Sequence, residues 1–183
     1  MNTNNFAHFS EEMLVSLTEK LDSQYYRQLE QMLLKAEGYC RHLKEIDVHN
    51  TFSQYIDACR KLLYELNTFL QHRRCVMMPY IRELVLKSAD GHDCSTCAGA
   101  CDVGHAAHVS EMQASQLRMK ELLYNIEKLT LQYNQYTECS IEYKMLKAEM
   151  LLISTSLSDL FYVEEMHLLR KILEEQQSIR IRK

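Results

Sequence analysis

Apolar residues recur at steps of three and four along four long segments of this chain. The four series occupy residues 13–43, 52–80, 112–133 and 145–172. This spacing places the apolar side chains on one face of an α-helix and leaves polar residues on the other. The pattern therefore predicts four long amphipathic helices, the third of which spans about residues 105–136.

Two kinds of connection separate these segments. Residues 47–51 include Asp, Asn and Thr, which predicts a short link and hence antiparallel neighbours. Residues 88–104 form a longer irregular stretch that holds three of the four glycines and three of the seven cysteines. Pro79 removes a backbone hydrogen bond within the second helix, so a kink is expected near Cys75. The predicted fold is all-α: an antiparallel up-down four-helix bundle.

The composition agrees with one globular domain. The chain has 183 residues, of which 46% are apolar and 25% are charged, with only four Gly and one Pro. So few helix breakers favour long helices over a many-turned β architecture. We therefore predict a single domain over residues 1–183, with a Cys-rich loop at residues 88–104 between the second and third helices.

Charge and hydropathy argue against several classes of function. A net charge of −4 leaves no basic surplus to neutralise phosphates, so a nucleic-acid partner is not expected. No stretch approaches the ~18 apolar residues of a membrane helix, and the N-terminal residues contain no secretory signal pattern. A cytoplasmic location without membrane association follows as the expectation. Apolar stripes exposed on long helices also suggest a homodimer.

The predicted inner faces carry an unusual set of residues near the middle of each helix. These residues combine ionisable, amide, aromatic and aliphatic side chains, and by helical periodicity they converge on one region of the interior. They are Tyr25, Tyr26, Phe69, Arg73, Gln116, Leu160 and Glu164.

The segments around these residues resemble the hemerythrin-like family, and in particular the C-terminal di-iron domain of iron–sulfur-cluster repair proteins. The resemblance extends over at least residues 21–169. It rests on residues 25–29 (YYRQL), 65–69 (ELNTF), 76–81 (VMMPYI), 112–116 (MQASQ) and 159–164 (DLFYVE). These segments are similar to the family's His-His-x-x-Leu, Glu-Leu-x-x-His, Leu-Phe-Pro-x-Ile, Met-x-x-Glu-His and Asp-His-x-x-x-Glu motifs, and the separations between them also fit.

On this resemblance, the chain keeps the framework of the family and loses most of its iron ligands. Histidine positions are taken by Tyr25 or Tyr26, Phe69, Gln116 and Leu160, and one bridging glutamate position is taken by Arg73. Of the ligand positions, Glu164 alone keeps a residue that can hold iron. No di-iron centre is therefore expected, and the oxygen, peroxide, nitric oxide and iron-donation chemistry of the family is not carried over.

A buried ion pair between Arg73 and Glu164 is the predicted replacement for the metal. A buried carboxylate without a partner costs several kcal/mol, and a guanidinium on the facing helix removes that cost. A tyrosine at position 25 or 26 and Gln116 would add hydrogen bonds, while Phe69 and Leu160 would fill the remaining volume. The alternative is that Arg73 extends outward to solvent and leaves Glu164 exposed.

A second candidate site lies in the Cys-rich loop. Cys94, Cys97 and Cys101, together with His105 or His108, have the spacing and ligand types of a tetrahedral zinc site. One zinc, or an iron–sulfur centre, is the metal-binding interpretation. A thiol–disulfide switch and a loop with no metal or redox chemistry remain as alternatives.

Two classes of function follow from these features. The first is a non-enzymatic regulatory or interaction module that has lost its di-iron site and responds to metal or redox state through the Cys/His loop. The second is a metal-dependent enzyme, or an iron–sulfur-cluster repair or stress protein, with a relocated metal site. No Gly-rich phosphate loop or Ser/His/Asp arrangement points to another enzyme class.

Overall fold

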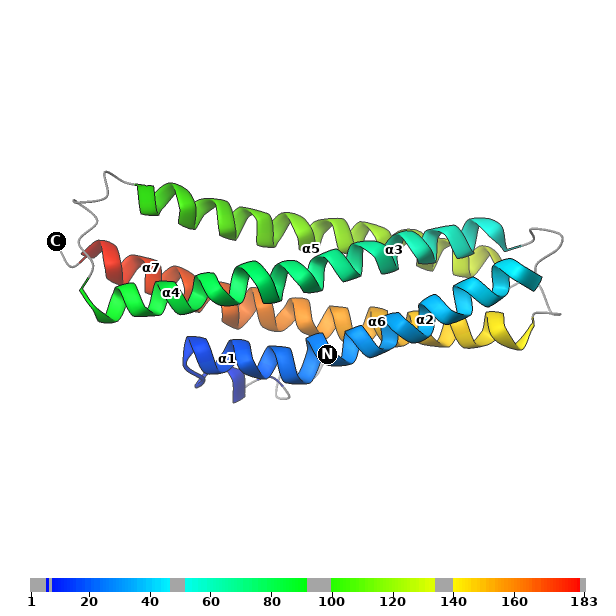
Figure 1. Cartoon of the computed structure of the whole chain (residues 1–183), viewed down its shortest axis with the longest axis horizontal. Helices are drawn as coiled ribbons and strands as arrows, with labels where there is room; N and C mark the ends of the chain where they lie inside the picture. Colours follow the sequence, from blue (N-terminus) through cyan, green and yellow to red (C-terminus); the bar gives the residue numbers. More distant parts are fainter. Residues whose placement is uncertain (1–5, 7, 47–51, 92–99, 134–139, 182–183) are drawn as a thin grey trace.

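The computed structural model is an antiparallel four-helix bundle, as the hydrophobic pattern predicted (Figure 1). It describes residue 6 and residues 8–46, 52–91, 100–133 and 140–181. Within these residues, no helix is both long enough and apolar enough to cross a membrane.

Three of the four long helices contain a short π-helical segment, named η, between two α-helical parts. The helical segments are, in chain order, α1 (Leu14–Leu21), η2 (Asp22–Tyr26), α2 (Arg27–Ile46), α3 (Ser53–His72), η3 (Arg73–Met77), α4 (Met78–Ala89), α5 (Ala100–Tyr133), α6 (Ile141–Val163), η4 (Glu164–Leu168) and α7 (Leu169–Ile181).

Each long helix packs along its neighbours. In one half of the bundle α2 lies between α6 and α3, and α3 also packs on α5 (Figure 1). In the other half α4 contacts α1 and α7. The π-helical segments lie where the two halves meet, so the middle of the bundle is the region in which the helices depart from regular α geometry.

Local sequence explains where several of these helices begin and end. The Ser140 side chain caps α6 by accepting a hydrogen bond from the Tyr143 backbone N–H at 3.2 Å. Pro79 is the second residue of α4, directly after η3, where its missing N–H removes one hydrogen bond from the continuous helix. Beyond α4, Gly91 has a φ of 68°, a left-handed conformation that glycine adopts without strain.

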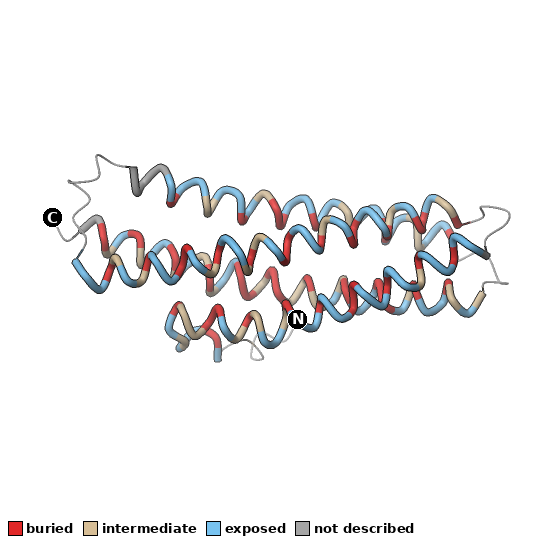
Figure 2. Tube along the Cα trace, viewed as in Figure 1, coloured by how far each residue is buried: buried red, intermediate tan, exposed pale blue. Residues whose placement is uncertain are grey.

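The core follows the inner faces of all four helices, where buried positions recur at helical spacing (Figure 2). Several positions were predicted wrongly. Val76, in the apolar series at 52–80, and Met145 and Leu152, in the series at 145–172, were predicted to face the core but are exposed. On α6 the buried line runs instead through Tyr143, Leu146, Met150 and Ile153, and it joins the predicted line at Leu157. Apolar residues on both faces of α6 made its phase ambiguous.

The irregular stretch predicted at residues 88–104 is shorter than expected. The helix α4 continues to Ala89, and α5 begins at Ala100 rather than near residue 105. The small residues of this region suggested a loop, but Ala is the strongest helix former and extends the start of α5. Residues 92–99 lie outside the described part of the chain.

Candidate functional site

A buried ion pair lies at the centre of the bundle. The side chains of Arg73 and Glu164 are both 0% exposed. Arg73 Nε donates to Glu164 Oε1 at 2.8 Å, and Arg73 Nη2 donates to Glu164 Oε2 at 3.0 Å. This two-point contact is the strongest geometry available to a guanidinium and a carboxylate. The predicted ion pair is confirmed, and the alternative in which Arg73 reaches solvent is wrong.

The other two helices complete the coordination of the same carboxylate. The Tyr26 hydroxyl donates to Glu164 Oε1 at 3.0 Å, and Gln116 Nε2 donates to Glu164 Oε2 at 2.6 Å. Of the two candidate tyrosines, Tyr26 therefore reaches the cluster, whereas Tyr25 packs against the core from a half-buried position. Each of the four long helices contributes one residue to this cluster, which consists of Tyr26, Arg73, Gln116 and Glu164 and is called the central cluster below.

Apolar and aromatic side chains close the central cluster from water. Phe69 is 3% exposed and Leu160 is 0% exposed, as predicted. The Phe69 ring lies 4.2 Å from Arg73 Cζ, a cation–π contact, and meets the Phe161 ring at 5.8 Å. This shell lowers the local dielectric and strengthens the hydrogen bonds that it encloses.

Two further groups satisfy the guanidinium, and the sequence did not reveal them. The Met112 carbonyl oxygen accepts from Arg73 Nη2 at 3.2 Å, and His72 Nδ1 lies 3.2 Å from Arg73 Nη1. A backbone acceptor has no sequence signal. His72 is half-buried.

Burial and neighbouring charges shift the pKa values of Tyr26, Arg73 and His72. Burial, reinforced by the Glu164 carboxylate, raises the pKa of Tyr26 well above its ordinary value, so the hydroxyl stays protonated and can donate. Burial alone lowers the pKa of Arg73, but the adjacent Glu164 outweighs it and the net pKa is raised. Burial and then Arg73 lower the pKa of His72.

Three of the four members of the central cluster lie in π-helical segments, and Gln116 lies in α5. Tyr26 is the last residue of η2, while Arg73 and Glu164 are the first residues of η3 and η4. The Pro79 signal predicted a distortion near Cys75, and η3 is found there. Nothing in the sequence signalled the segments at η2 and η4. π-helical turns concentrate at functional sites, which supports a special role for this level of the bundle.

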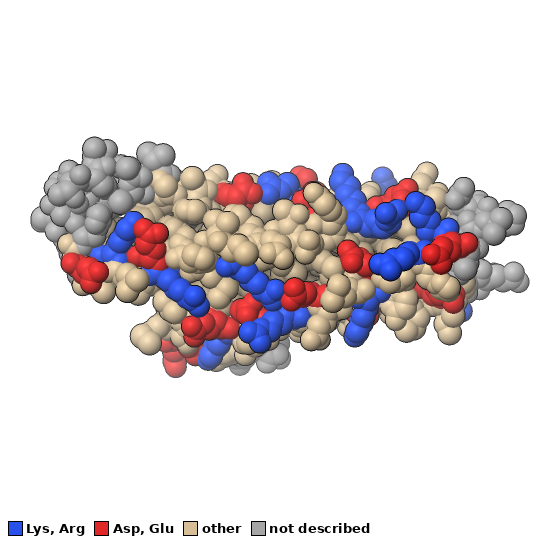
Figure 3. All heavy atoms as spheres, viewed as in Figure 1, with Lys and Arg blue, Asp and Glu red and all other residues tan. Residues whose placement is uncertain are grey.

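Surface ion pairs join the helices at the same level. Asp22 in η2 accepts from Arg74 in η3 at 2.7 Å, and Arg74 also contacts Glu30 at 3.0 Å. Across the bundle, Lys120 on α5 pairs with Glu165 in η4. Acidic and basic side chains are interspersed over the face seen in Figure 3. Such surface pairs, of which Arg74–Asp22 is partly buried, add little stability individually, but they bridge the π-helical segments.

The central cluster does not suit a di-iron centre. Iron in such sites requires several carboxylate and imidazole ligands, and the cluster provides one carboxylate. The guanidinium of Arg73 is always protonated and has no acceptor. Within the described residues, no group of three or more His, Cys, Asp or Glu side chains is placed to hold a metal ion.

The Cys/His loop site is described only in part. Cys94 and Cys97, and the side chain of Cys101, lie outside the described residues. His105 is buried, with Nδ1 3.1 Å from the Tyr80 hydroxyl oxygen, and His108 stacks on the Tyr80 ring at 4.2 Å. The Tyr80 hydroxyl oxygen also accepts from Gln176 Nε2 at 2.8 Å. Both histidines therefore face one side of α5 and contact the same tyrosine.

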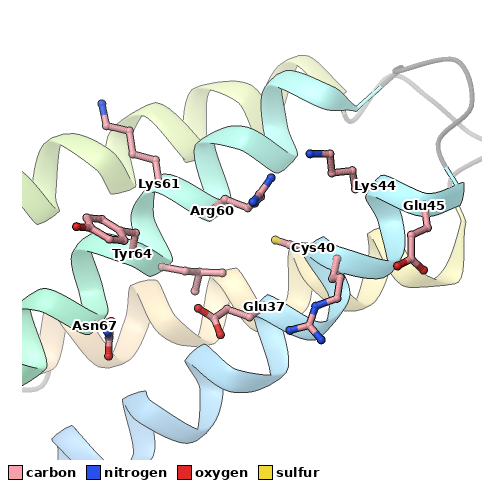
Figure 4. Close-up of a pocket in the computed structure, with 10 residues that line it drawn as sticks. Glu37, Cys40, Lys44, Glu45, Arg60, Lys61, Tyr64 and Asn67 are labelled. Carbon is pink, nitrogen blue, oxygen red and sulfur yellow. The ribbon is translucent and has the colours of Figure 1, made fainter.

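A charged hollow of about 610 Å³ lies between α2 and α3, apart from the central cluster (Figure 4). Arg60 and Lys44 extend toward one another across it, while Glu45 extends away. Cys40 lines its floor, and burial raises the pKa of this thiol to about 12 even though Arg60 lowers it. The thiol is therefore protonated at neutral pH and is a poor nucleophile.

Comparison with known proteins adds no assignment to these sites. No protein-family model, no curated protein and no solved structure matches the chain. The resemblance to the hemerythrin-like family stays a prediction from the motifs.

Proposed function

We propose that this protein is a non-enzymatic, hemerythrin-like module in which the central cluster replaces a di-iron centre. The observation that carries the proposal is the state of Glu164. A carboxylate has about four acceptor positions, and all of them are taken by donors from Tyr26, Arg73 and Gln116. The cluster is chemically saturated, so it supports a structural role rather than ligand binding or proton transfer.

The Arg73–Glu164 ion pair balances the charge that a di-iron centre would otherwise neutralise. A di-iron centre neutralises bridging carboxylates with metal charge, and removal of the metal alone would leave those carboxylates buried and unpaired. A guanidinium in place of one carboxylate both removes a negative charge and adds a positive one. The remaining carboxylate of Glu164 then has an internal counter-ion at 2.8 Å, and no metal is needed to hold the helices together.

The regulatory part of the proposal concerns the Cys/His loop. Cys94, Cys97 and Cys101 precede His105 and His108, and the two histidines lie beside Tyr80 near the start of α5. A metal bound there, or a disulfide formed there, would change the connection between α4 and α5. Such a change would report metal or redox state to a partner without any reaction in the bundle.

Metal analysis of the purified protein tests both parts of this proposal. We expect no iron bound stoichiometrically in the bundle, and about one zinc per chain that is lost on Cys94→Ser. The control is Cys75→Ser, which removes an exposed thiol away from the loop and should keep the zinc. Two irons per chain would refute the loss of the di-iron site. An iron–sulfur absorption spectrum in anaerobically purified protein would favour the alternative, a repair protein with a relocated site.

Self-association is the third part of the proposal. Large apolar side chains such as Leu34, Tyr64 and Leu86 are exposed on three different helical segments. Burial of such side chains contributes about 25 cal/mol per Å² of apolar area, and a homodimer would bury some of them. Sedimentation velocity over a wide concentration range should show a dimer, and a monomer at every concentration would remove this part.

A further inference from the structure

The hollow between α5 and α6 has the size and lining of a site for a small apolar molecule. Its volume is about 650 Å³, within the roughly 300–1,000 Å³ that ligand sites occupy. Its apolar lining includes Leu123, Tyr124, Leu131, Met150 and Leu151. Three of these side chains, Tyr124, Leu131 and Leu151, are also exposed to solvent. A bound apolar ligand would remove them from water.

The hollow is elongated and has a polar end. Its lining on α5 runs from Lys120 to Leu131, which at 1.5 Å per residue is about 17 Å. Because α5 and α6 are antiparallel, Leu131 lies toward Lys144 and Lys147 on α6. Lys144 is exposed and makes no ion pair with any described residue. Lys144 and Lys147 therefore stand at one end of the hollow, while Lys120 at the other end is paired with Glu165 and Glu127 lies between them on α5.

A buried hydroxyl on the floor of the hollow also points to a ligand. Tyr55 lines the hollow from α3 and is 0% exposed. Its hydroxyl makes no hydrogen bond of ordinary length and angle among the described residues, and the side chains of Thr130 and Cys59 are its nearby polar groups. Buried polar groups without a partner are rare in folded proteins, and each calls for an explanation. A polar atom of a bound molecule would satisfy this hydroxyl.

We propose that this hollow binds a long-chain carboxylic acid. The carboxylate lies by Lys144 and Lys147, where two ammonium groups complement its charge, and the acyl chain runs along the apolar side chains toward Lys120. The occupant is a single extended chain rather than a helix of a partner protein. The lining follows the length of α5 and α6 in one elongated hollow, which fits an extended acyl chain. The site goes beyond the proposed function and does not depend on it.

Calorimetry and thermal unfolding with defined lipids test the ligand class. Palmitate, kept below its micelle concentration, should bind and raise the unfolding temperature. Hexanoate lacks most of the apolar chain and hexadecanol lacks the carboxylate, so each should bind at least about tenfold more weakly. Equal binding of hexadecanol and palmitate would overturn the role of the lysines, and no binding of palmitate would overturn the site.

Matched variants test the location. Leu151→Gln and Lys144→Gln should each weaken palmitate binding at least about tenfold, whereas Leu86→Gln on α4 and Lys35→Gln on α2 should change it by less than about twofold. All four residues are exposed, so misfolding is not expected. Equal losses in the hollow and control variants would refute the location.

Tyr55→Phe separates a ligand contact from a purely structural role. Removal of an unpaired buried hydroxyl should leave the ligand-free unfolding temperature unchanged or higher, while the rise caused by palmitate should shrink. A lower unfolding temperature without ligand, with the palmitate effect intact, would show that the hydroxyl serves the fold only.

Discussion

Glu164 determines the character of the bundle interior because a buried carboxylate must be fully satisfied or neutralised. Glu164 accepts two hydrogen bonds from the Arg73 guanidinium, one from the Tyr26 phenol and one from the Gln116 amide. These three donors lie on the three other long helices. None of these donors can accept a proton or exchange electrons near neutral pH. The residues therefore act as a fixed polar joint between four helices.

Arg73→Met tests the ion pair. This change leaves the Glu164 carboxylate buried without its counter-ion, and we expect a loss of about 3–5 kcal/mol in the free energy of unfolding. The double variant Arg73→Met/Glu164→Leu should recover most of that loss, because neither charge remains. Urea unfolding followed by circular dichroism measures both.

The exposed pair between Arg118 and Glu111 provides the control for this cycle. Both side chains are 50% exposed, so Arg118→Met should cost less than about 1 kcal/mol. A coupling energy near zero between Arg73 and Glu164 would contradict the role assigned to their ion pair.

Tyr26→Phe tests the phenol separately from the ion pair. The substitution keeps the ring and removes one hydrogen bond to a charged group, so unfolding should become easier by about 1.5–3 kcal/mol. Tyr25→Phe is the matched control because Tyr25 does not reach Glu164, and it should have a much smaller effect. If the two variants lose the same stability, the Tyr26 hydroxyl has no special role.

The lowered pKa of His72 leads us to expect that the free energy of unfolding falls in acid. Burial and the neighbouring Arg73 lower the pKa of His72 from its ordinary value of 6.5, and burial also lowers the pKa of His167. The folded state therefore favours the neutral rings. The contribution of the two neutral histidines to the free energy of unfolding is complete above about pH 6.5. It is lost as the pH falls from there through the pKa values of the folded state. His72→Gln should reduce the slope of unfolding free energy against pH in this window, and an unchanged slope would exclude His72 as a cause.

At the scale of elements, the sequence predicted the four helices well and the π-helical segments poorly. Apolar spacing depends on periods of about 3.6 residues, and it identified every long helix. A π-helical turn bonds residue i to i+5 and accommodates one additional residue. The resulting one-residue shift of the apolar series looks like the alternation of three- and four-residue steps in a regular helix. Tyr25 and Tyr26 show the consequence, because only the true geometry of η2 decides which of them faces inward.

The residues of the candidate site that lie on regular helical patterns could be predicted from the sequence, and the contacts that depend on packing could not. Arg73, Gln116 and Glu164 fall on the inner faces of regular patterns, and their convergence could be predicted. The Met112 carbonyl and the half-buried His72 could not, since backbone acceptors and ring orientation depend on packing. On α6, Met145 and Leu152 were misplaced because apolar residues occur on both faces of that helix.

A one-residue deletion tests the π-helical nature of η3. Removing Cys75, which is exposed, should convert the bulge into an α-helical turn while α3 and α4 keep their faces. Deletion of the exposed Asn67 in regular α3 instead rotates everything beyond it by about 100°. We expect the Cys75 deletion to fold with a modest loss of stability and the Asn67 deletion to lose cooperative unfolding in circular dichroism. Equal damage would argue against a bulge at η3.

At the scale of the whole molecule, the central cluster couples all four helices through one carboxylate. Surface pairs join neighbouring helices two at a time, as Arg74 does with Asp22 and Glu30. The cluster instead connects η2, η3, α5 and η4 at once. Loss of one donor should therefore loosen the middle of every helix rather than only the helix that carries the substitution.

Hydrogen exchange in the Gln116→Leu variant tests this coupling. The change leaves Glu164 Oε2 without one of its donors, and amide exchange should accelerate in η2, η3 and η4 as well as in α5. Gln113→Leu, on the same helix and exposed, is the matched control and should leave η2, η3 and η4 unchanged. Faster exchange confined to α5 would mean that the four helices are stabilised independently. In that case packing of the apolar faces, rather than the shared carboxylate, would hold the middle of the bundle together.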